Sequence, residues 1–335
     1  MGAGCRPVPP ATPTQASGDP YAFELLDQSL VLQQGAVLRD RSFVLSSRFR
    51  GSAAIVVAGS EVAVRDVRIL GPGLAPADPE GPAPVGIRVE NVRDVAVDRV
   101  SIQGLPNSAI LGHGIDGGLF RDVMIRACRS GIRLGDAASR GLRLERIHTE
   151  SGGPAGEALS LGSLRDSVVA DCRAVGEMSG SFELTNPQKV RIQGVRGASL
   201  RIQGTVERPP GGDAPVPDVV IEDCLLDKGL GHGAALSARS CLELSQTVGS
   251  VRIERCILNA AAQNGHAIEL SRNSHGRVVD CTIRGFNGVS GAIPSHAVDL
   301  SGGSSVNDDF ERVNHFVEQK RIRSDRNRRP GRAPA

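Results

Sequence analysis

The chain has 335 residues, of which 40% are hydrophobic, 23% charged and 3% aromatic, and its 39 basic and 37 acidic residues give a formal net charge of +2. This composition is that of a globular protein, and the absence of any run of 18 apolar residues excludes a membrane-spanning helix. With no Trp and a single Tyr, the large core residues are Val, Ile and Leu, which favour β-strands.

Residues 1–18 form a Pro/Thr-rich arm that we expect to be disordered. Within it, Ala3-Gly4-Cys5 is similar to the end of a bacterial lipoprotein signal, although no apolar stretch precedes it. One interpretation is an extracytoplasmic bacterial protein, secreted or lipid-anchored at Cys5, whose signal lies upstream of the printed start. The other is a chance cysteine in the arm of a cytoplasmic protein. Residues 19–29 have amphipathic spacing and predict an N-terminal capping helix.

A short pattern then recurs along residues 30–306, as in "RDVRI", "RDVMI", "EDCLL" and "ERCIL". Its central residues, which we call the markers, are Phe43, Val67, Val100, Val123, Ile147, Cys172, Val195, Cys224, Cys256 and Cys281. Subtracting successive positions gives spacings of 24, 33, 23, 24, 25, 23, 29, 32 and 25, so the basic period is 23 to 25 residues with insertions in three repeats. A fixed period of this size is typical of a solenoid.

Within each repeat the apolar residues alternate with period 2 in short segments bounded by Gly, Asp, Asn and Ser. The chain therefore predicts an all-β fold, a single solenoid of about ten to eleven coils with three short strands each and short helical caps. The repeat pattern resembles the right-handed parallel β-helices of the pectate-lyase-like superfamily over roughly residues 30–300. The resemblance is to the architecture and matches no single enzyme family. The leucine-rich repeat, the nearest alternative by period, lacks its signature here.

Four markers are cysteines at positions where other repeats have Val or Ile. A buried Cys behaves as a small hydrophobe, and no C-x-x-C pair that would indicate a zinc ribbon is present. Because stacked side chains point the same way, we expect free thiols.

The strand preceding each marker carries the candidate chemistry. Its outward residue, between two inward aliphatic residues, forms a column across the repeats: Val31, Val56, Arg88, Leu111, Arg133, Ser160, Glu183, Arg201, Glu243, Glu269 and Asp299. On strands about 4.8 Å apart, three successive acids repel one another unless a cation or an arginine intervenes. We expect Glu243, Glu269 and Asp299 to form one outward-facing acidic column.

Other candidate site residues surround these acids. His266 and His296 each precede an acid by three residues and should lie beside the column, while Arg201 should lie at its N-terminal side. The insertions 205–217, 227–240 and 285–295 would form walls next to it, and long loops on a rigid scaffold often carry function.

Paired carboxylates suit glycosidic bond cleavage. The sequence therefore predicts a polysaccharide lyase or glycoside hydrolase, with Glu243, Glu269, Asp299, Arg201, His266 and His296 as catalytic candidates. Few aromatic residues are available to stack on neutral sugars, which favours an acidic polysaccharide read by Arg88 and Arg133, with Glu183 beside them. Three acids near histidines also suit Ca²⁺ or a transition metal. In lyases that share the resembled fold, such acids are expected to hold Ca²⁺ while an Arg or Lys abstracts a proton, and Arg201 is best placed here.

Three alternatives remain open. The acids are surface charge paired with arginines, the histidines are turn residues, or the protein is a non-catalytic surface or carbohydrate-binding module. Nucleic acid is not expected as a partner, because basic and aromatic residues are not interleaved. The sequence carries no signal for an oligomeric state.

The C-terminal region begins where the repeats end. Phe310, Val313, Phe316 and Val317 have helical spacing, which predicts a cap over residues 307–323, although Val313 also fits a final marker. From Lys320 onward there are seven basic residues and one acid, a charge of +6, and we expect residues 324–335 to be disordered.

Overall fold

The structure is a computed structural model that describes residues 22–73, 83–135, 137–152, 156–177, 179–204, 218–232, 240–246, 250–260, 266–272, 274–284, 298–317 and 322–324. The expected disordered arm, the disordered tail and His296 lie outside these residues, as do most of the three insertions. No helix among the described residues is long and apolar enough to cross a membrane.

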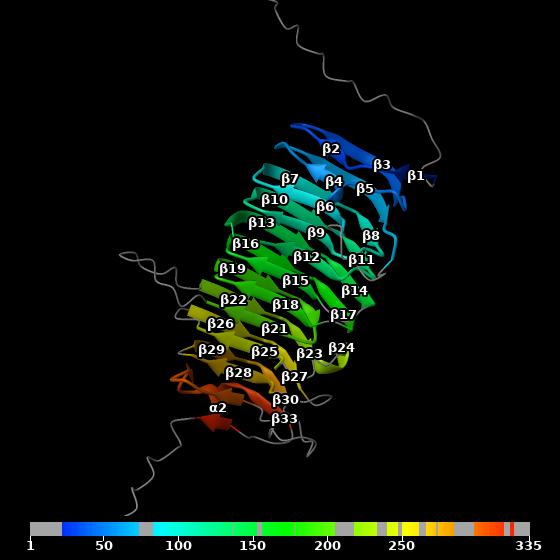
Figure 1. The fold of residues 1–335 in the computed structure, drawn as a ribbon. Helices are drawn as coiled ribbons and strands as arrows, with labels where there is room; N and C mark the ends of the chain where they lie inside the picture. Colours follow the sequence, from blue (N-terminus) through cyan, green and yellow to red (C-terminus); the bar gives the residue numbers. More distant parts are fainter. Residues whose placement is uncertain are drawn as a thin grey trace, which may run out of the picture.

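The molecule is a column of stacked coils, confirming the predicted all-β parallel β-helix (Figure 1). Each full coil contributes one strand to a first sheet and two strands, separated by a tight turn, to a second sheet. In one coil these are β12 (Ser130–Leu134), β13 (Ser139–Glu145) and β14 (His148–Gly152). Every printed strand pair is parallel, so each coil hydrogen-bonds to the coils before and after it.

The first sheet has 12 described strands, so the expected count of ten to eleven coils is not confirmed. Besides β12 these are β2 (Leu30–Leu32), β4 (Ala53–Val57), β6 (Val85–Glu90), β9 (Ser108–His113), β15 (Glu157–Gly162), β18 (Gly180–Thr185), β21 (Leu200–Gln203), β25 (Leu242–Ser245), β28 (Ile268–Ser271), β31 (Val298–Leu300) and β34 (Ile322–Ser324).

The second sheet is best followed as two rows of strands that flank the turns. The middle row contains β3 (Val37–Leu45), β5 (Ala63–Leu70), β7 (Arg93–Asp98), β10 (Asp116–Arg121), β13, β16 (Leu164–Ala170), β19 (Gln188–Gln193), β22 (Asp218–Glu222), β26 (Ser250–Glu254), β29 (His275–Val279) and β32 (Ser305–Val306). The third row contains β1 (Phe23–Leu26), β8 (Ser101–Gln103), β11 (Met124–Arg126), β14, β17 (Arg173–Glu177), β20 (Arg196–Gly197), β23 (Leu225–Asp227), β24 (Gly231–His232), β27 (Ile257–Asn259), β30 (Thr282–Arg284) and β33 (His315–Val317).

The turn between the middle and third rows explains the recurring marker motif. The residue before the marker has a positive φ in coil after coil, for example Asp122 at 54° and Arg146 at 51°. This left-handed residue bends the chain sharply between the two strands, and Asp tolerates that conformation better than most residues do. The marker then points inward, and all ten markers, including the four cysteines, are at most 2% exposed. The alignment of the first marker is wrong, because Phe43 pairs with Ile69. Arg41, which follows the left-handed Asp40, is the residue that pairs with Val67. The six described cysteines are free, as expected.

Charges alternate along the same turn. The residues before successive markers from Val67 to Cys281 are Asp66, Arg99, Asp122, Arg146, Asp171, Gly194, Asp223, Arg255 and Asp280. Arg99 donates two hydrogen bonds of 2.7 Å to Asp66, and Arg146 donates two of 2.6 and 2.8 Å to Asp122. Register thus stacks opposite charges here, and the hydrogen bonds from Arg146 lower the pKa of Asp122.

The predicted N-terminal helix over residues 19–29 is wrong for the residues that the structure describes. Phe23–Leu26 is strand β1, which pairs in parallel with Ser42–Leu45 of β3. The physical reason is the open edge of the first coil: a strand satisfies the exposed backbone groups of β3, whereas a helix of two turns would leave them unpaired.

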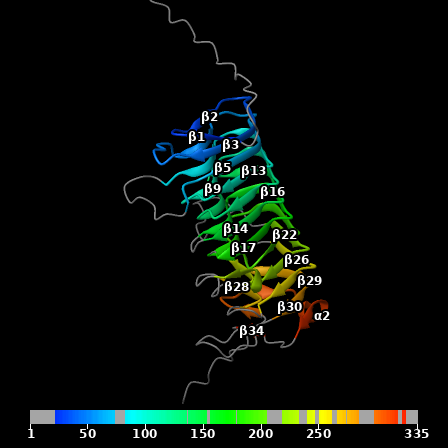
Figure 2. The same cartoon turned by 90° about the vertical axis from the view of Figure 1, so that its right-hand side faces the viewer.

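At the other end, the predicted helical cap is partly confirmed. Residues Phe310–Val313 form the short helix α2. The 3₁₀ turn η1 (Lys228–Leu230) is not part of this cap, since it lies between β23 and β24. After α2 the chain returns to the solenoid, since β33 pairs with β30 and β34 with β31. Asn314 accepts a hydrogen bond from the Cys281 amide at 2.9 Å, so the cap is joined to the last marker turn. The cap lies at the C-terminal end of the column of coils (Figure 2).

The alternating turn charges predict acid sensitivity. Because the pKa of Asp122 is lowered in the folded state, its stabilising effect is present above the unfolded Asp pKa and is lost as the pH falls through the folded value. Asp122→Asn should cost about 0.5 kcal/mol at neutral pH and almost nothing at low pH, measured by urea unfolding. Asp94→Asn is the control, since Asp94 also has a positive φ but no ion pair among the described residues. Equal effects of both substitutions at both pH values would contradict the prediction.

The buried thiols should be inert. Burial raises the pKa of Cys128 to about 11 and of Cys172 and Cys241 to about 12, because a thiolate is poorly solvated there. At about pH 8, iodoacetamide should leave these three cysteines unmodified in the folded protein and alkylate them in guanidinium chloride, as read by mass spectrometry. Rapid labelling of any of them in the folded state would show that the coil opens.

Candidate functional site

The structure confirms the register that the sequence predicted for the acidic column. Strand pairing aligns Glu183 with Arg201, Arg201 with Glu243, Glu243 with Glu269, and Glu269 with Asp299. These residues lie on β18, β21, β25, β28 and β31 of the first sheet, and their neighbours along each strand point into the core. The side chains of Glu243 and Asp299 are only 17% and 15% exposed, so the column faces outward but is largely covered.

Arg201 lies between two of the acids. Its guanidinium is 3.8 Å from Glu183 Oε1, and its Nε is 3.5 Å from Glu243 Oε2. This Nε is buried and makes no hydrogen bond within the described part of the chain. Arg201 therefore compensates charge at the N-terminal side of the column, while its side chain remains 33% exposed.

Ser240 joins the next two acids and was not anticipated from the sequence. Its backbone N–H donates to Glu243 Oε1 at 2.8 Å, and its hydroxyl donates to Glu269 Oε2 at 2.9 Å. The same hydroxyl accepts a hydrogen bond from the His266 amide at 3.2 Å. Ser240 is fully buried, so it holds both carboxylates from the side that faces away from solvent. Its position three residues before Glu243 matches that of His266 before Glu269, which is the signal that could have identified it.

His266 orients the third acid. Its Nε2 is 3.5 Å from Asp299 Oδ2, and its side chain is 10% exposed. His266 is therefore in the site where the sequence placed it, but it is buried against the column and does not project from an open turn. Its predicted counterpart, His296, lies outside the described residues.

The remaining candidates occupy the N-terminal half of the same column. Arg88 aligns with Leu111, and Leu111 with Arg133, so the two arginines are two coils apart and distant from the acids. Arg88 Nε lies 3.6 Å from Glu90 Oε1, and Arg133 is exposed. The structure therefore does not bring these arginines into contact with Glu243, Glu269 or Asp299.

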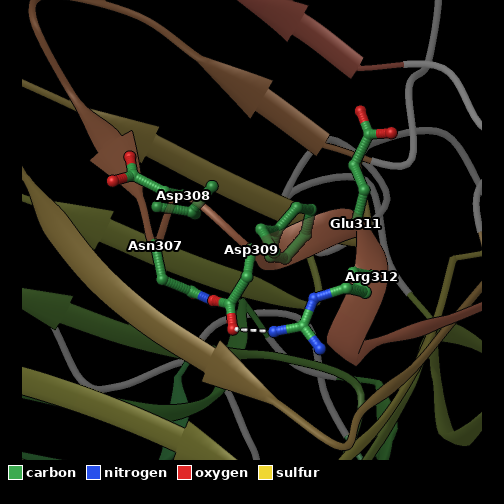
Figure 3. Close-up of a pocket in the computed structure, with 7 residues that line it drawn as sticks. Asn307, Asp308, Asp309, Glu311 and Arg312 are labelled. Carbon is green, nitrogen blue, oxygen red and sulfur yellow. Dashed lines mark hydrogen bonds and ion pairs between the residues drawn. The ribbon is translucent and has the colours of Figure 1, made fainter.

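Two cavities in the described part of the chain lie away from the acidic column. One, of about 600 Å³, is lined by residues 306–312 at the C-terminal cap, where Arg312 pairs with Asp309 at 3.0 Å (Figure 3). The other, of about 330 Å³, runs along the charged turns that contain Asp66, Arg99 and Asp122. Among all the residues that the structure describes, no group of three or more His, Cys, Asp or Glu residues is arranged to hold a metal ion.

Comparisons with known proteins identify the class of fold. No protein-family model and no curated protein sequence matches this chain. Among solved structures, it is similar to DFA-IIIase from Arthrobacter chlorophenolicus A6 in complex with GF2, with 13% identity, coverage of 89% of this chain and 86% of that one, and a TM-score of 0.55. It is also similar to the A-module of the Azotobacter vinelandii mannuronan C-5 epimerase AlgE6, with 14% identity, 90% and 87% coverage, and a TM-score of 0.49.

A third similar structure is the catalytic domain of a GH87 α-1,3-glucanase in complex with nigerose, with 11% identity, 94% and 70% coverage, and a TM-score of 0.42. The first of these likenesses, together with the strand order, confirms the fold as a right-handed parallel β-helix. At this level of identity the comparisons establish the fold, and the chemistry has to be argued from the site.

Removing the Ser240 hydroxyl tests the geometry of the column. Ser240→Ala should lower the free energy of unfolding by about 1–3 kcal/mol, because the buried His266 amide loses its acceptor and Glu269 loses a donor. Urea unfolding measures this, with Ser101→Ala on strand β8 as a partly exposed control that should change stability by under about 0.5 kcal/mol. A silent Ser240→Ala would mean that the hydroxyl does not hold the column together.

Proposed function

We propose that the protein is a polysaccharide-active β-helix enzyme that cleaves an acidic glycan at the acidic column. The observation that carries the proposal is the contact of one buried residue, Ser240, with both Glu243 and Glu269. Like charges in one register are unfavourable, so a rigid arrangement that holds them together is typical of a site in which carboxylates act as a pair.

The arrangement suits glycosidic hydrolysis by two carboxyl groups. Strands about 4.8 Å apart place successive side chains near the roughly 5–5.5 Å separation of retaining enzymes. Arg201 compensates the charge of Glu243, which suits the carboxylate that attacks or stabilises the sugar. Glu269, aligned with Glu243 on the next coil, is then the second carboxyl group of the pair, the one that would donate a proton to the leaving oxygen.

The same contacts make a lyase with Arg201 as its base less favourable. A guanidinium keeps its proton in proteins, so Arg201 is a poor general base. Binding of the substrate is the more suitable role, since the guanidinium lies between Glu183 and Glu243 on a side chain that is 33% exposed. Arg88 and Arg133, farther along the column, would contact other acidic units of a glycan lying along the solenoid.

A non-catalytic carbohydrate-binding module is the second candidate. The observation that favours it is that Arg88 and Arg133 lie on the same outward column as the acids but at a distance from them, which suits binding of an extended chain along the surface. The two candidates differ in what happens when a single carboxylate is neutralised.

Glu269→Gln distinguishes them. If the column is catalytic, the substitution should lower turnover of oligouronates by at least about a hundredfold, because a positioned proton donor contributes that much or more. The assay follows reducing ends for hydrolysis and ultraviolet absorbance of unsaturated products for elimination, with and without EDTA to test Ca²⁺. Glu254→Gln on β26 is the matched control, since Glu254 is a partly buried acid on the second sheet. Unchanged turnover in the variant would contradict catalysis by the column, and binding without any turnover in the parent protein would favour the module.

A further inference from the structure

A second charged column lies on the third row of strands, and it is not part of the proposed catalytic site. Strand pairing aligns His148 of β14 with Arg173 of β17, and Arg173 with Arg196 of β20. Each of these residues directly follows a marker, so all three point outward at the same place in successive coils. Strands β11, β14 and β17 follow one another along one flank of the solenoid (Figure 1).

The two arginines of this basic column have no ion pair within the described residues. Both are exposed, whereas Arg99, Arg146 and Arg255, on the adjacent turns, each bind a carboxylate at 2.9 Å or less. Like charges directly opposite one another on neighbouring strands are destabilising, and these strands are about 4.8 Å apart. The protein therefore holds together two cations that no described side chain neutralises.

The surroundings of the column leave it positively charged. The nearest acid on the same strands is Glu150, which is already bound by Arg126 at 3.2 Å. Counting Arg126, Arg173 and Arg196 against Glu150 and Glu177 on these strands gives +1 with His148 neutral. Beyond Arg196 the column continues with Leu225 and Ile257, so the positive charge ends there.

We propose that His148, Arg173 and Arg196 form a binding site for an acidic sugar chain, separate from the acidic column of the first sheet. A planar guanidinium binds a carboxylate through two parallel hydrogen bonds, and two guanidinium groups one coil apart can bind neighbouring acidic units. The choice of an acidic glycan as ligand rests on the proposed function. Strands β11, β14, β17 and β20 contain no Phe, Tyr or Trp on which a nucleic-acid base could stack.

The site also has a built-in dependence on pH. Burial lowers the pKa of His148, and Arg173 and Arg126 lower it further, while Glu150 opposes them. His148 is therefore neutral at pH 7 in the free protein. A bound carboxylate would favour its protonated form, so binding takes up a proton and should tighten as the pH falls from about 7.5 to about 5.5.

The test uses Glu269→Gln protein, so that probes stay intact, and compares Arg173→Gln/Arg196→Gln with Arg165→Gln/Arg277→Gln. The control pair removes the same charge from exposed arginines of the middle row, on β16 and β29. The probes are fluorescent oligogalacturonate and oligomannuronate, the carboxyl-reduced form of each, and an oligothymidylate of matched charge.

We expect the Arg173/Arg196 variant to bind one of the oligouronates about tenfold more weakly at low ionic strength, and the control variant less than about twofold more weakly. The reduced probes should not bind, His148→Gln should reduce the gain on acidification, and thermal unfolding of the Arg173/Arg196 variant should be unchanged or slightly higher because repulsion is relieved.

The proposal is overturned by equal losses in the two variants, by no binding of either oligouronate, or by tighter binding of the oligothymidylate than of both. Turnover by the protein with Glu269 intact is measured separately. A failure of the catalytic proposal would therefore show as absent turnover with Arg173-dependent binding retained. A failure of this site would show as turnover that is present while binding does not depend on Arg173.

Discussion

Parallel register is the constraint on which the rest of this structure depends. Because each coil hydrogen-bonds to the next with residues in matching positions, a residue at one place in the repeat always has the same place in the next repeat as its neighbour. The side chains therefore form columns about 4.8 Å apart, and each column has to tolerate contact between its own members. Aliphatic residues and cysteines meet this requirement inside the solenoid, where identical neighbours pack well.

Charged residues meet the same requirement only by alternating or by binding something else. The turn before the markers shows the first solution, with Asp66 bound by Arg99, Asp122 by Arg146 and Asp223 by Arg255. Each arginine spans to the acid of the preceding coil, so the ion pairs add to the hydrogen bonds that join the coils. Individually such exposed pairs contribute little, but here three of them recur along the turn.

Other stacked arginines, such as Arg140 with Arg165 and Arg252 with Arg277, include one member that binds a carboxylate. The two functional candidates are columns in which like charges are stacked without such an alternation. On the first sheet, three acids are stacked, and buried polar partners from the preceding turn, Ser240 and His266, hold them in place. On the third row, two arginines are stacked with no described acid to separate them. In a repeat protein, a column that repels itself costs stability in the empty molecule. A bound ligand that supplies the opposite charge, or a reaction that needs closely spaced carboxylates, offsets that cost.

The two proposed sites would divide the chemistry of a single long ligand between two faces. The acids with Arg201 suit bond cleavage and short-range recognition, since their side chains are largely covered and fixed. The exposed arginines of the third row suit attachment of the remainder of an acidic chain, because mobile, solvated cations bind carboxylates without demanding one geometry. Sugar recognition by charge also fits a protein with no Trp and a single Tyr.

The sequence by itself determined the coil, the columns and the identity of the acids in register. This was possible because parallel neighbours are one repeat apart, so aligning the markers is enough to place Glu243, Glu269 and Asp299 together, and the same alignment places His148, Arg173 and Arg196 directly after three markers. Two features depended on the tertiary structure: how the open edge of the first coil is paired, and which side chains of the turns contact the acidic column. Residues 23–26 became a strand because the open edge of β3 offered backbone partners, which amphipathic spacing does not reveal. Ser240 contacts two carboxylates, and His266 is buried against Asp299, because the turns entering β25 and β28 follow paths that no period describes. The repeat sets where a strand lies, but the course of a turn depends on three-dimensional contacts with the neighbouring coils.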